Sequence, residues 1–133
     1  MKRKYTGIAA FLFALPFYAQ ADAVSELEVE YQANGAGNFS ASKGEALWNK
    51  TFIDPTKGDE RSCTSCHTTN LKQPGKHAKT GKMIQPMAPS INPKRLSTTK
   101  KIKKWFTRNC KWTLGRECTD QEKGDVLAFL KNL

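Results

Sequence analysis

The segment Cys63–His67 reads C-x-x-C-H and constrains this chain more than any other feature of its sequence. This pattern is the attachment sequence for a c-type haem. Two thiols at this spacing lie on one turn, where each can form a thioether to one haem vinyl group. The histidine that follows directs its imidazole at the iron as the proximal ligand. The sequence therefore predicts one covalently bound haem c, held by Cys63, Cys66 and His67.

Three other uses of these side chains are chemically reasonable, but each fits the sequence less well. A thioredoxin-type pair begins a helix beside a βαβ pattern, whereas this chain has no run with the alternation of a strand. A zinc site would need further ligands, and Cys110 and Cys118 stand too far apart for the usual short ligand spacing. A disulfide between Cys63 and Cys66 would leave the adjacent histidine unexplained. Haem attachment is favoured.

Residues 1–23 have the organisation of a cleaved secretory signal peptide. A basic start precedes an apolar run over residues 7–19, and small residues then offer cleavage after Ala21 or Ala23. The run is shorter than the ~20 residues that span a bilayer, and Pro16 interrupts it. We therefore expect a periplasmic protein that is not embedded in the membrane after cleavage. This oxidising compartment suits both covalent haem attachment and disulfides.

The chain of 133 residues is strongly basic, with a formal net charge of +10 at pH 7. Such a charge is compatible with nucleic acid, anionic lipid or an acidic protein as the partner. Because the sequence indicates an exported haem protein, we expect an acidic redox protein and no nucleic acid. The rest of the chain divides into an N-terminal helix and connector over residues 24–41 and a haem domain over residues 42–133.

The helical signals predict an all-α fold around the haem. The expected helices cover residues 25–32, a segment after Ser42, residues 98–110 after a Ser97 cap, and a C-terminal segment after Thr119. Ser42 and Glu45 form one expected capping box, and Thr119 and Glu122 form another. In the segment after Ser42 we expect Gly44, Leu47, Trp48 and Thr51 to share a face, with Gly44 letting another helix approach closely. The natural partner is the C-terminal stripe of Val126, Leu127, Leu130 and Leu133.

Three side chains are candidates for the sixth iron position. Asn109 follows Ile102, Trp105 and Phe106 at helical spacing, so a polar group falls on an apolar stripe. Met87 lies in a proline-rich strap over residues 83–93, where many c-type cytochromes place a methionine ligand; otherwise it fills space at the haem edge. His77 lies in a basic loop and is more typical of a solvated histidine.

Three further groups have expected roles around the haem. The Pro74 carbonyl is the expected acceptor for the second ring nitrogen of His67. Cys110 and Cys118 are not used by the haem, so in an oxidising compartment we expect them to form a disulfide. Closing so short a loop stabilises a fold by roughly 2–3 kcal/mol. The residues alone offer only Arg108 or Arg116 as weak candidates to pair with the haem propionates.

Taken in order, these segments resemble a class I cytochrome c and, more closely, the sphaeroides haem protein family, the oxygen-binding monohaem cytochromes c with histidine/asparagine ligation. The specific block is Arg108-Asn-Cys110 followed by Gly115-Arg-Glu-Cys118. The similarity covers most of the mature chain. It rests on residues 44–48, 63–67, 75–82, 86–90, 104–110, 115–118 and 122–130.

The resemblance implies a class I cytochrome c-like helical domain with His67 as the proximal ligand and Asn109 as the distal ligand. It implies Cys63 and Cys66 as the thioether residues, with a Cys110–Cys118 disulfide beside the distal ligand. In that family the asparagine leaves the iron on reduction, and O2, NO or CO can then bind. The redox partners there include a dihaem cytochrome c and a membrane cytochrome b.

Two functions follow as expectations. The first is an exported cytochrome that binds diatomic ligands when reduced and receives electrons from other periplasmic cytochromes. The alternative is a simple electron-transfer cytochrome c with Met87 as a permanent sixth ligand. The sequence does not decide whether the protein is an enzyme, with nitric oxide dioxygenase or oxygen-reducing activity.

Overall fold

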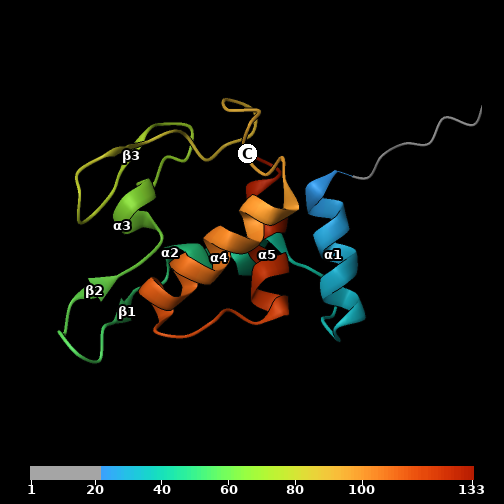
Figure 1. Cartoon of the computed structure of the whole chain (residues 1–133), viewed down its shortest axis with the longest axis horizontal. Helices are drawn as coiled ribbons and strands as arrows, with labels where there is room; N and C mark the ends of the chain where they lie inside the picture. The colour runs from blue at the N-terminus through green and yellow to red at the C-terminus, as the bar shows by residue number, and fades with distance from the viewer. Residues whose placement is uncertain (1–21) are drawn as a thin grey trace, which may run out of the picture.

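The computed structural model describes residues 22–133, in which five helices dominate and strands are confined to two short hairpins (Figure 1). In that view α1 lies at one end of the molecule and α3 with the hairpins at the other, with α2, α4 and α5 between them. The predicted all-α class is confirmed. The helices are α1 (Ala23–Ala33), α2 (Ala41–Asn49), α3 (Thr64–His67), α4 (Thr99–Leu114) and α5 (Asp120–Leu130).

The two hairpins are antiparallel pairs of two-residue strands. The first pairs β1 (Phe52–Ile53) with β2 (Glu60–Arg61), and the second pairs β3 (Gly75–Lys76) with β4 (Met83–Ile84). They flank the C-x-x-C-H segment in the sequence. Strands this short have no alternating run to reveal them, so the sequence did not predict them.

The expected signal peptide lies outside the described residues except for its last two positions. Asp22 is the N-cap of α1, where its carboxylate accepts hydrogen bonds from the backbone N–H groups of Val24 and Ser25. The helix therefore begins two residues earlier than the sequence predicted. Within residues 22–133 no helix is both long and apolar enough to cross a membrane.

The close packing of α2 on α5 depends on Gly44. A Cβ atom at this position would stand 2.0 Å from the backbone carbonyl oxygen of Asp125, so only glycine allows the two backbones this near. Asp125 itself is buried and accepts a hydrogen bond from the Ser40 backbone N–H at 2.7 Å. The expected approach of the C-terminal helix at Gly44 is confirmed.

Two of the expected N-cap residues are wrong, and one is confirmed. Ser40, rather than Ser42, is the N-cap of α2, because Asp125 of α5 holds the Ser40 backbone at that point. Thr98, rather than Ser97, is the N-cap of α4. The Ser97 hydroxyl turns back to the Lys94 carbonyl instead. The capping box of Thr119 and Glu122 at the start of α5 is present as expected.

The core consists of two hydrophobic clusters that meet at Leu96 and Phe106, which pack against both. The first cluster joins α1 to α4 and α5, and the second joins α2, α5 and the loop that follows α3. Helix α5 contributes to both clusters and is the central helix of the fold. The buried residues are Val24, Leu27, Tyr31, Ile102 and Leu127 in the first cluster, and Trp48, Leu71, Val126 and Leu130 in the second.

Candidate haem-binding site

The C-x-x-C-H segment forms the single helical turn α3, which brings its two cysteines and the histidine onto one short element. The Cys63 carbonyl accepts the backbone N–H groups of Cys66 at 3.3 Å and His67 at 3.1 Å. Hydroxyl groups of Ser62, Thr64 and Ser65 brace the start of the turn. The chain leaves it through Thr68 in the left-handed region (φ 62°), a conformation uncommon for a residue with a Cβ.

Both cysteines of the motif are free, and both are partly buried. Desolvation raises the pKa of Cys63 to about 11, so its thiol is neutral at physiological pH. Because both thiols are free, the structure contradicts a Cys63–Cys66 disulfide. Within residues 22–133 no three histidine, cysteine, aspartate or glutamate side chains converge as a metal-ion site requires, so the zinc alternative has no support.

His67 packs against α2. Its ring lies 5.3 Å from the Trp48 ring, measured between centroids. Burial and, to a smaller extent, the positive charge of Arg95 together lower the pKa of His67 to about 4. The imidazole is therefore neutral near pH 7, the form that binds iron. The indole N–H of Trp48 is buried and has no hydrogen-bond partner among the described residues.

Gly75 allows the second hairpin to lie directly against the motif. A Cβ atom at this position would stand 2.1 Å from the Cys66 carbonyl oxygen and 2.9 Å from the Cα atom of His67. The loop between β3 and β4 makes a second contact with the motif, because the Ala78 backbone N–H donates to the Cys66 sulfur at 3.4 Å. No hydrogen bond joins the His67 ring to Pro74 in the described structure, so that expectation stays a prediction.

These residues fit a covalently attached haem. Two free thiols and a neutral imidazole on one turn are the groups that such attachment uses. The buried indole N–H of Trp48 has no hydrogen-bond partner among the described residues, and the ring of Trp105 on α4 is half-exposed, so each leaves a contact that a bound haem could supply. A haem bound to α3 would supply iron and one-electron redox chemistry at this place.

The candidates for the sixth position have different surroundings. Asn109 is exposed on α4, three residues beyond Phe106, which packs against the same cluster as Cys63. Met87 is half-buried against that cluster too, and its backbone N–H donates to the Leu71 carbonyl at 3.0 Å. The exposed ring of His77 accepts a hydrogen bond from the Thr80 backbone N–H in its own loop, which favours the solvated interpretation.

The apolar stripe expected on α4 divides into two faces. Ile102, Cys110 and Thr113 are buried, whereas Trp105 is 50% exposed and Asn109 is exposed. The helix also continues to Leu114 rather than ending at Cys110, because Gly115 closes it in the left-handed region (φ 73°). Trp105 and Asn109 thus share a side of α4 that the apolar core leaves open.

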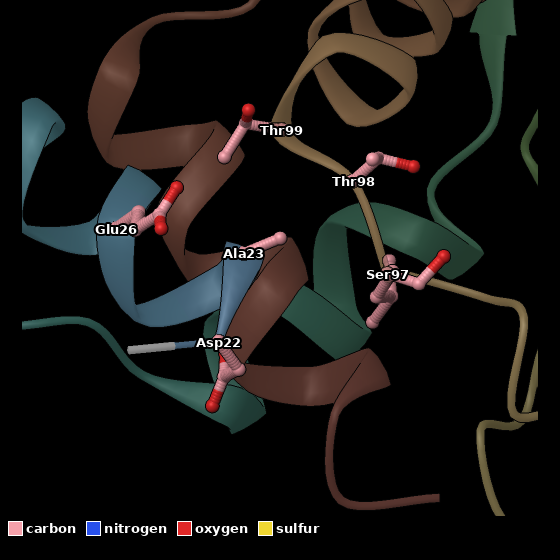
Figure 2. Close-up of a pocket in the computed structure, with 7 residues that line it drawn as sticks. Asp22, Ala23, Glu26, Ser97, Thr98 and Thr99 are labelled. Carbon is pink, nitrogen blue, oxygen red and sulfur yellow. The ribbon is translucent and has the colours of Figure 1, made fainter. Parts of the chain in front are cut away.

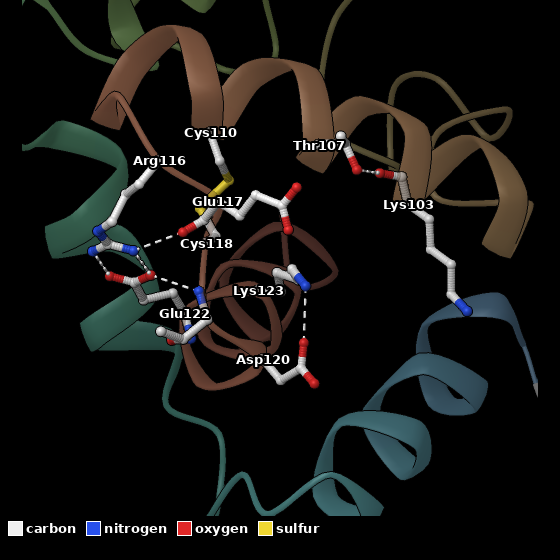
Figure 3. Close-up of a disulfide and its surroundings, with 10 residues drawn as sticks. Lys103, Thr107, Cys110, Arg116, Glu117, Cys118, Asp120, Glu122 and Lys123 are labelled. Carbon is white, nitrogen blue, oxygen red and sulfur yellow. Dashed lines mark hydrogen bonds and ion pairs between the residues drawn. A yellow bond between two sulfur atoms is a disulfide. The ribbon is translucent and has the colours of Figure 1, made fainter.

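Cys110 and Cys118 are joined by a disulfide, as the sequence led us to expect (Figure 3). It links the C-terminal half of α4 to the segment before α5, directly after Asn109 in the chain. Arg116 lies beside it and binds the Glu122 carboxylate through both terminal nitrogens, at 2.7 and 2.6 Å. This arginine already has an anionic partner, so the expectation that it pairs with a propionate loses support.

One charged residue near the motif escaped the sequence-based prediction. Arg95 is half-buried, donates through Nε to the Pro86 carbonyl at 2.9 Å, and is close enough to His67 to affect its pKa. It follows the proline strap in a segment without helical periodicity, so no pattern marked it. A hollow of about 460 Å³ lies elsewhere, at the N-termini of α1 and α4, and contains none of the candidate site residues (Figure 2).

Comparisons with known proteins agree on one group of relatives. Residues 34–130 match the family model described as a domain of unknown function, DUF1924. The chain is 37% identical to cytochrome c-type protein SHP of Cereibacter sphaeroides over 92% of this chain and 94% of that protein. It is 35% identical to cytochrome c'' of Methylophilus methylotrophus over 94% of this chain and 92% of that protein.

Two solved structures share the fold. The structure of oxidised SHP, described as an oxygen-binding cytochrome c, superposes with a TM-score of 0.73 at 36% identity, covering 83% of this chain and 96% of that one. The crystal structure of oxidised cytochrome c'' from Methylophilus methylotrophus gives a TM-score of 0.69 at 35% identity, covering 82% and 93%.

Proposed function

Because this chain belongs to the family of monohaem c-type cytochromes that contains SHP and cytochrome c'', we propose that it is a periplasmic cytochrome that binds a diatomic ligand when it is reduced. Its covalently bound haem is attached through Cys63 and Cys66, with His67 as the proximal ligand. The observation that carries this proposal is the C-x-x-C-H turn, with free thiols and a neutral, half-buried imidazole. The description of SHP as an oxygen-binding cytochrome c supports a diatomic molecule as the ligand.

Asn109 is the proposed distal ligand, and its chemistry makes the site depend on redox state. A neutral carboxamide is a hard, weak donor that suits Fe(III) better than Fe(II). Asn109 therefore binds in the oxidised protein and leaves on reduction, which opens the sixth position to O2, NO or CO. Trp105, which is exposed on the same side of α4, and the Asn109 amide would then border that position. The disulfide at Cys110 limits how far the asparagine backbone moves.

A simple electron-transfer cytochrome is the second candidate, and Met87 is the observation that favours it. This side chain packs against the same cluster as Cys63, from a strap whose backbone is bonded to Leu71. A thioether would stay bound in both redox states. In either case a dihaem cytochrome c or a membrane cytochrome b is the proposed electron donor, and the basic charge of the chain favours an acidic one.

Addition of carbon monoxide to the reduced protein separates the two functions. We expect a five-coordinate, high-spin spectrum on reduction and rapid formation of the CO spectrum, because the weak amide donor no longer competes. A reduced spectrum that stays low-spin and does not respond to CO would assign the protein to electron transfer through Met87.

We also predict that the mature protein begins at Asp22 and carries one haem. Cleavage after Ala21 keeps Asp22, whose carboxylate caps α1 (Figure 2). Cleavage after Ala23 would remove this cap and place the charged terminus on buried Val24. Loss of such a cap costs about 1 kcal/mol. Intact mass of periplasmic material, measured after denaturation, checks both points. A mass without one added haem would contradict the covalent attachment, and a start at Val24 would contradict the cap argument.

A further inference from the structure

We propose that Arg95 anchors a haem propionate beside the proximal histidine. This inference rests on the proposed haem site and adds a residue that the attachment motif does not contain. A haem held on α3 brings two carboxylates with it, and these need partners where they are not fully hydrated. The sequence offered Arg108 and Arg116 for this role, and the structure directs attention to a different arginine.

The hydrogen bonding of Arg95 is incomplete. A guanidinium has five N–H donors. Nε donates to the Pro86 carbonyl and one terminal nitrogen donates to the Gln85 carbonyl. The remaining donors have no protein acceptor within residues 22–133, and no carboxylate there forms an ion pair with Arg95. The two carbonyls therefore fix the plane of the guanidinium and leave its other N–H groups free to donate to a ligand.

The surroundings of Arg95 make an anionic partner favourable. The side chain is half-buried, and this desolvation lowers its pKa, although a guanidinium remains charged at any physiological pH. A partly desolvated cation without a counter-ion is costly, and an anion that binds its free donors removes much of that cost. The rigid fork suits a carboxylate, which can accept two parallel hydrogen bonds.

The position of Arg95 places that anion at the haem site. Its acceptor Pro86 directly precedes Met87, and Met87 packs against the cluster that includes Trp48 and Cys63. Trp48 in turn contacts the His67 ring. Leu96, the next residue after Arg95, packs against both core clusters and has a backbone in the left-handed region (φ 55°). This turn anchors the backbone beside the arginine, just after the strap whose Met87 packs against the second core cluster.

The two arginines that the sequence offered fit this role less well. Both terminal nitrogens of Arg116 are already bound to Glu122. The guanidinium of Arg108 lies over the Trp105 ring, 5.5 Å from its centroid, and is exposed on α4. Of the three, only Arg95 combines partial burial, free donors and a place beside the proximal side of the motif.

The test uses holoprotein carrying Arg95→Gln or Arg95→Lys, with Arg116→Gln as the matched control. The first readout is the propionate bending band in the resonance Raman spectrum, which reports hydrogen bonding to that group. The second is the reduction potential, since a positive charge near the iron favours the reduced state. We expect Arg95→Gln to shift the band and lower the potential, Arg95→Lys to restore most of the potential, and Arg116→Gln to change neither.

An unchanged band in Arg95→Gln would overturn the proposal, as would a shift that appears in Arg108→Gln instead. If Arg95→Gln does not accumulate, Arg95→Lys decides alone. Lysine keeps the charge but not the planar fork, so a shifted band at a near-native potential supports the anchor and an unchanged band refutes it. Neither result depends on which residue is the distal ligand, and the covalent haem is tested separately by intact mass.

Discussion

Gly44→Ala is expected to destabilise the folded protein by about 3 kcal/mol, which lowers the Tm by roughly 10–20 °C for a domain of this size. The added Cβ atom would stand 2.0 Å from the carbonyl oxygen of Asp125, 2.4 Å from its carbonyl carbon and 2.9 Å from the backbone nitrogen of Val126. No rotamer relieves a clash between two backbones, so α2 must move away from α5. Thermal unfolding of the holoprotein, followed by circular dichroism, measures the effect.

The sign of this result is informative because helix propensity acts in the opposite direction. Alanine in a helix interior is favoured over glycine by about 1 kcal/mol. The matched controls are Gly124→Ala, whose Cβ would meet the Phe39 ring at 2.1 Å, and Gly37→Ala, whose nearest neighbour is a flexible Gln121 oxygen at 3.5 Å. We expect a smaller loss for the first and almost none for the second. A Gly44→Ala protein as stable as the Gly37→Ala control would contradict the close α2–α5 contact.

The sequence predicted those features that depend on local chemistry. A glycine on the apolar face of a helix predicts close packing of a neighbouring helix, and Gly44 has that role. A threonine three residues before a glutamate predicts a capping box, and Thr119 and Glu122 form one. The spacing of C-x-x-C-H follows from the attachment reaction itself, so the motif predicts the cofactor from the sequence alone.

Other features were decided by contacts between distant parts of the chain. Ser40 caps α2 because buried Asp125, from the other end of the chain, holds its backbone. Periodicity placed Trp105 and Phe106 on one stripe, but a stripe of that width spans two faces, and only Phe106 packs against the core clusters. Arg95 lies in the irregular segment that follows the proline-rich strap, where no spacing relates it to His67. Its place became visible only through its bonds to the folded backbone.

Asn109→Val is expected to change the optical spectrum of the oxidised protein from low-spin to high-spin and to leave that of the reduced protein nearly unchanged. Valine offers no ligand atom, so the oxidised form should lose its sixth ligand and become high-spin, whereas the reduced form is already five-coordinate if the amide leaves on reduction. Asn109 is exposed, and a substitution at such a position changes the free energy of unfolding by about 0.5 kcal/mol or less. A spectral change therefore reports ligation rather than unfolding. Optical spectra of both redox states, with and without CO, provide the measurement.

Met87→Leu is the matched control, because it removes the alternative ligand and keeps the volume of the side chain. With Asn109 as the ligand, both oxidation states of Met87→Leu should resemble the wild type. Leucine fills the same space against the cluster of Trp48 and Leu71, so stability should fall by less than about 1.5 kcal/mol. If Met87→Leu instead loses a methionine–iron band while Asn109→Val stays low-spin in both states, the sixth ligand is Met87. The protein would then exchange electrons without opening its iron to a diatomic ligand, and redox-gated binding would have to be abandoned.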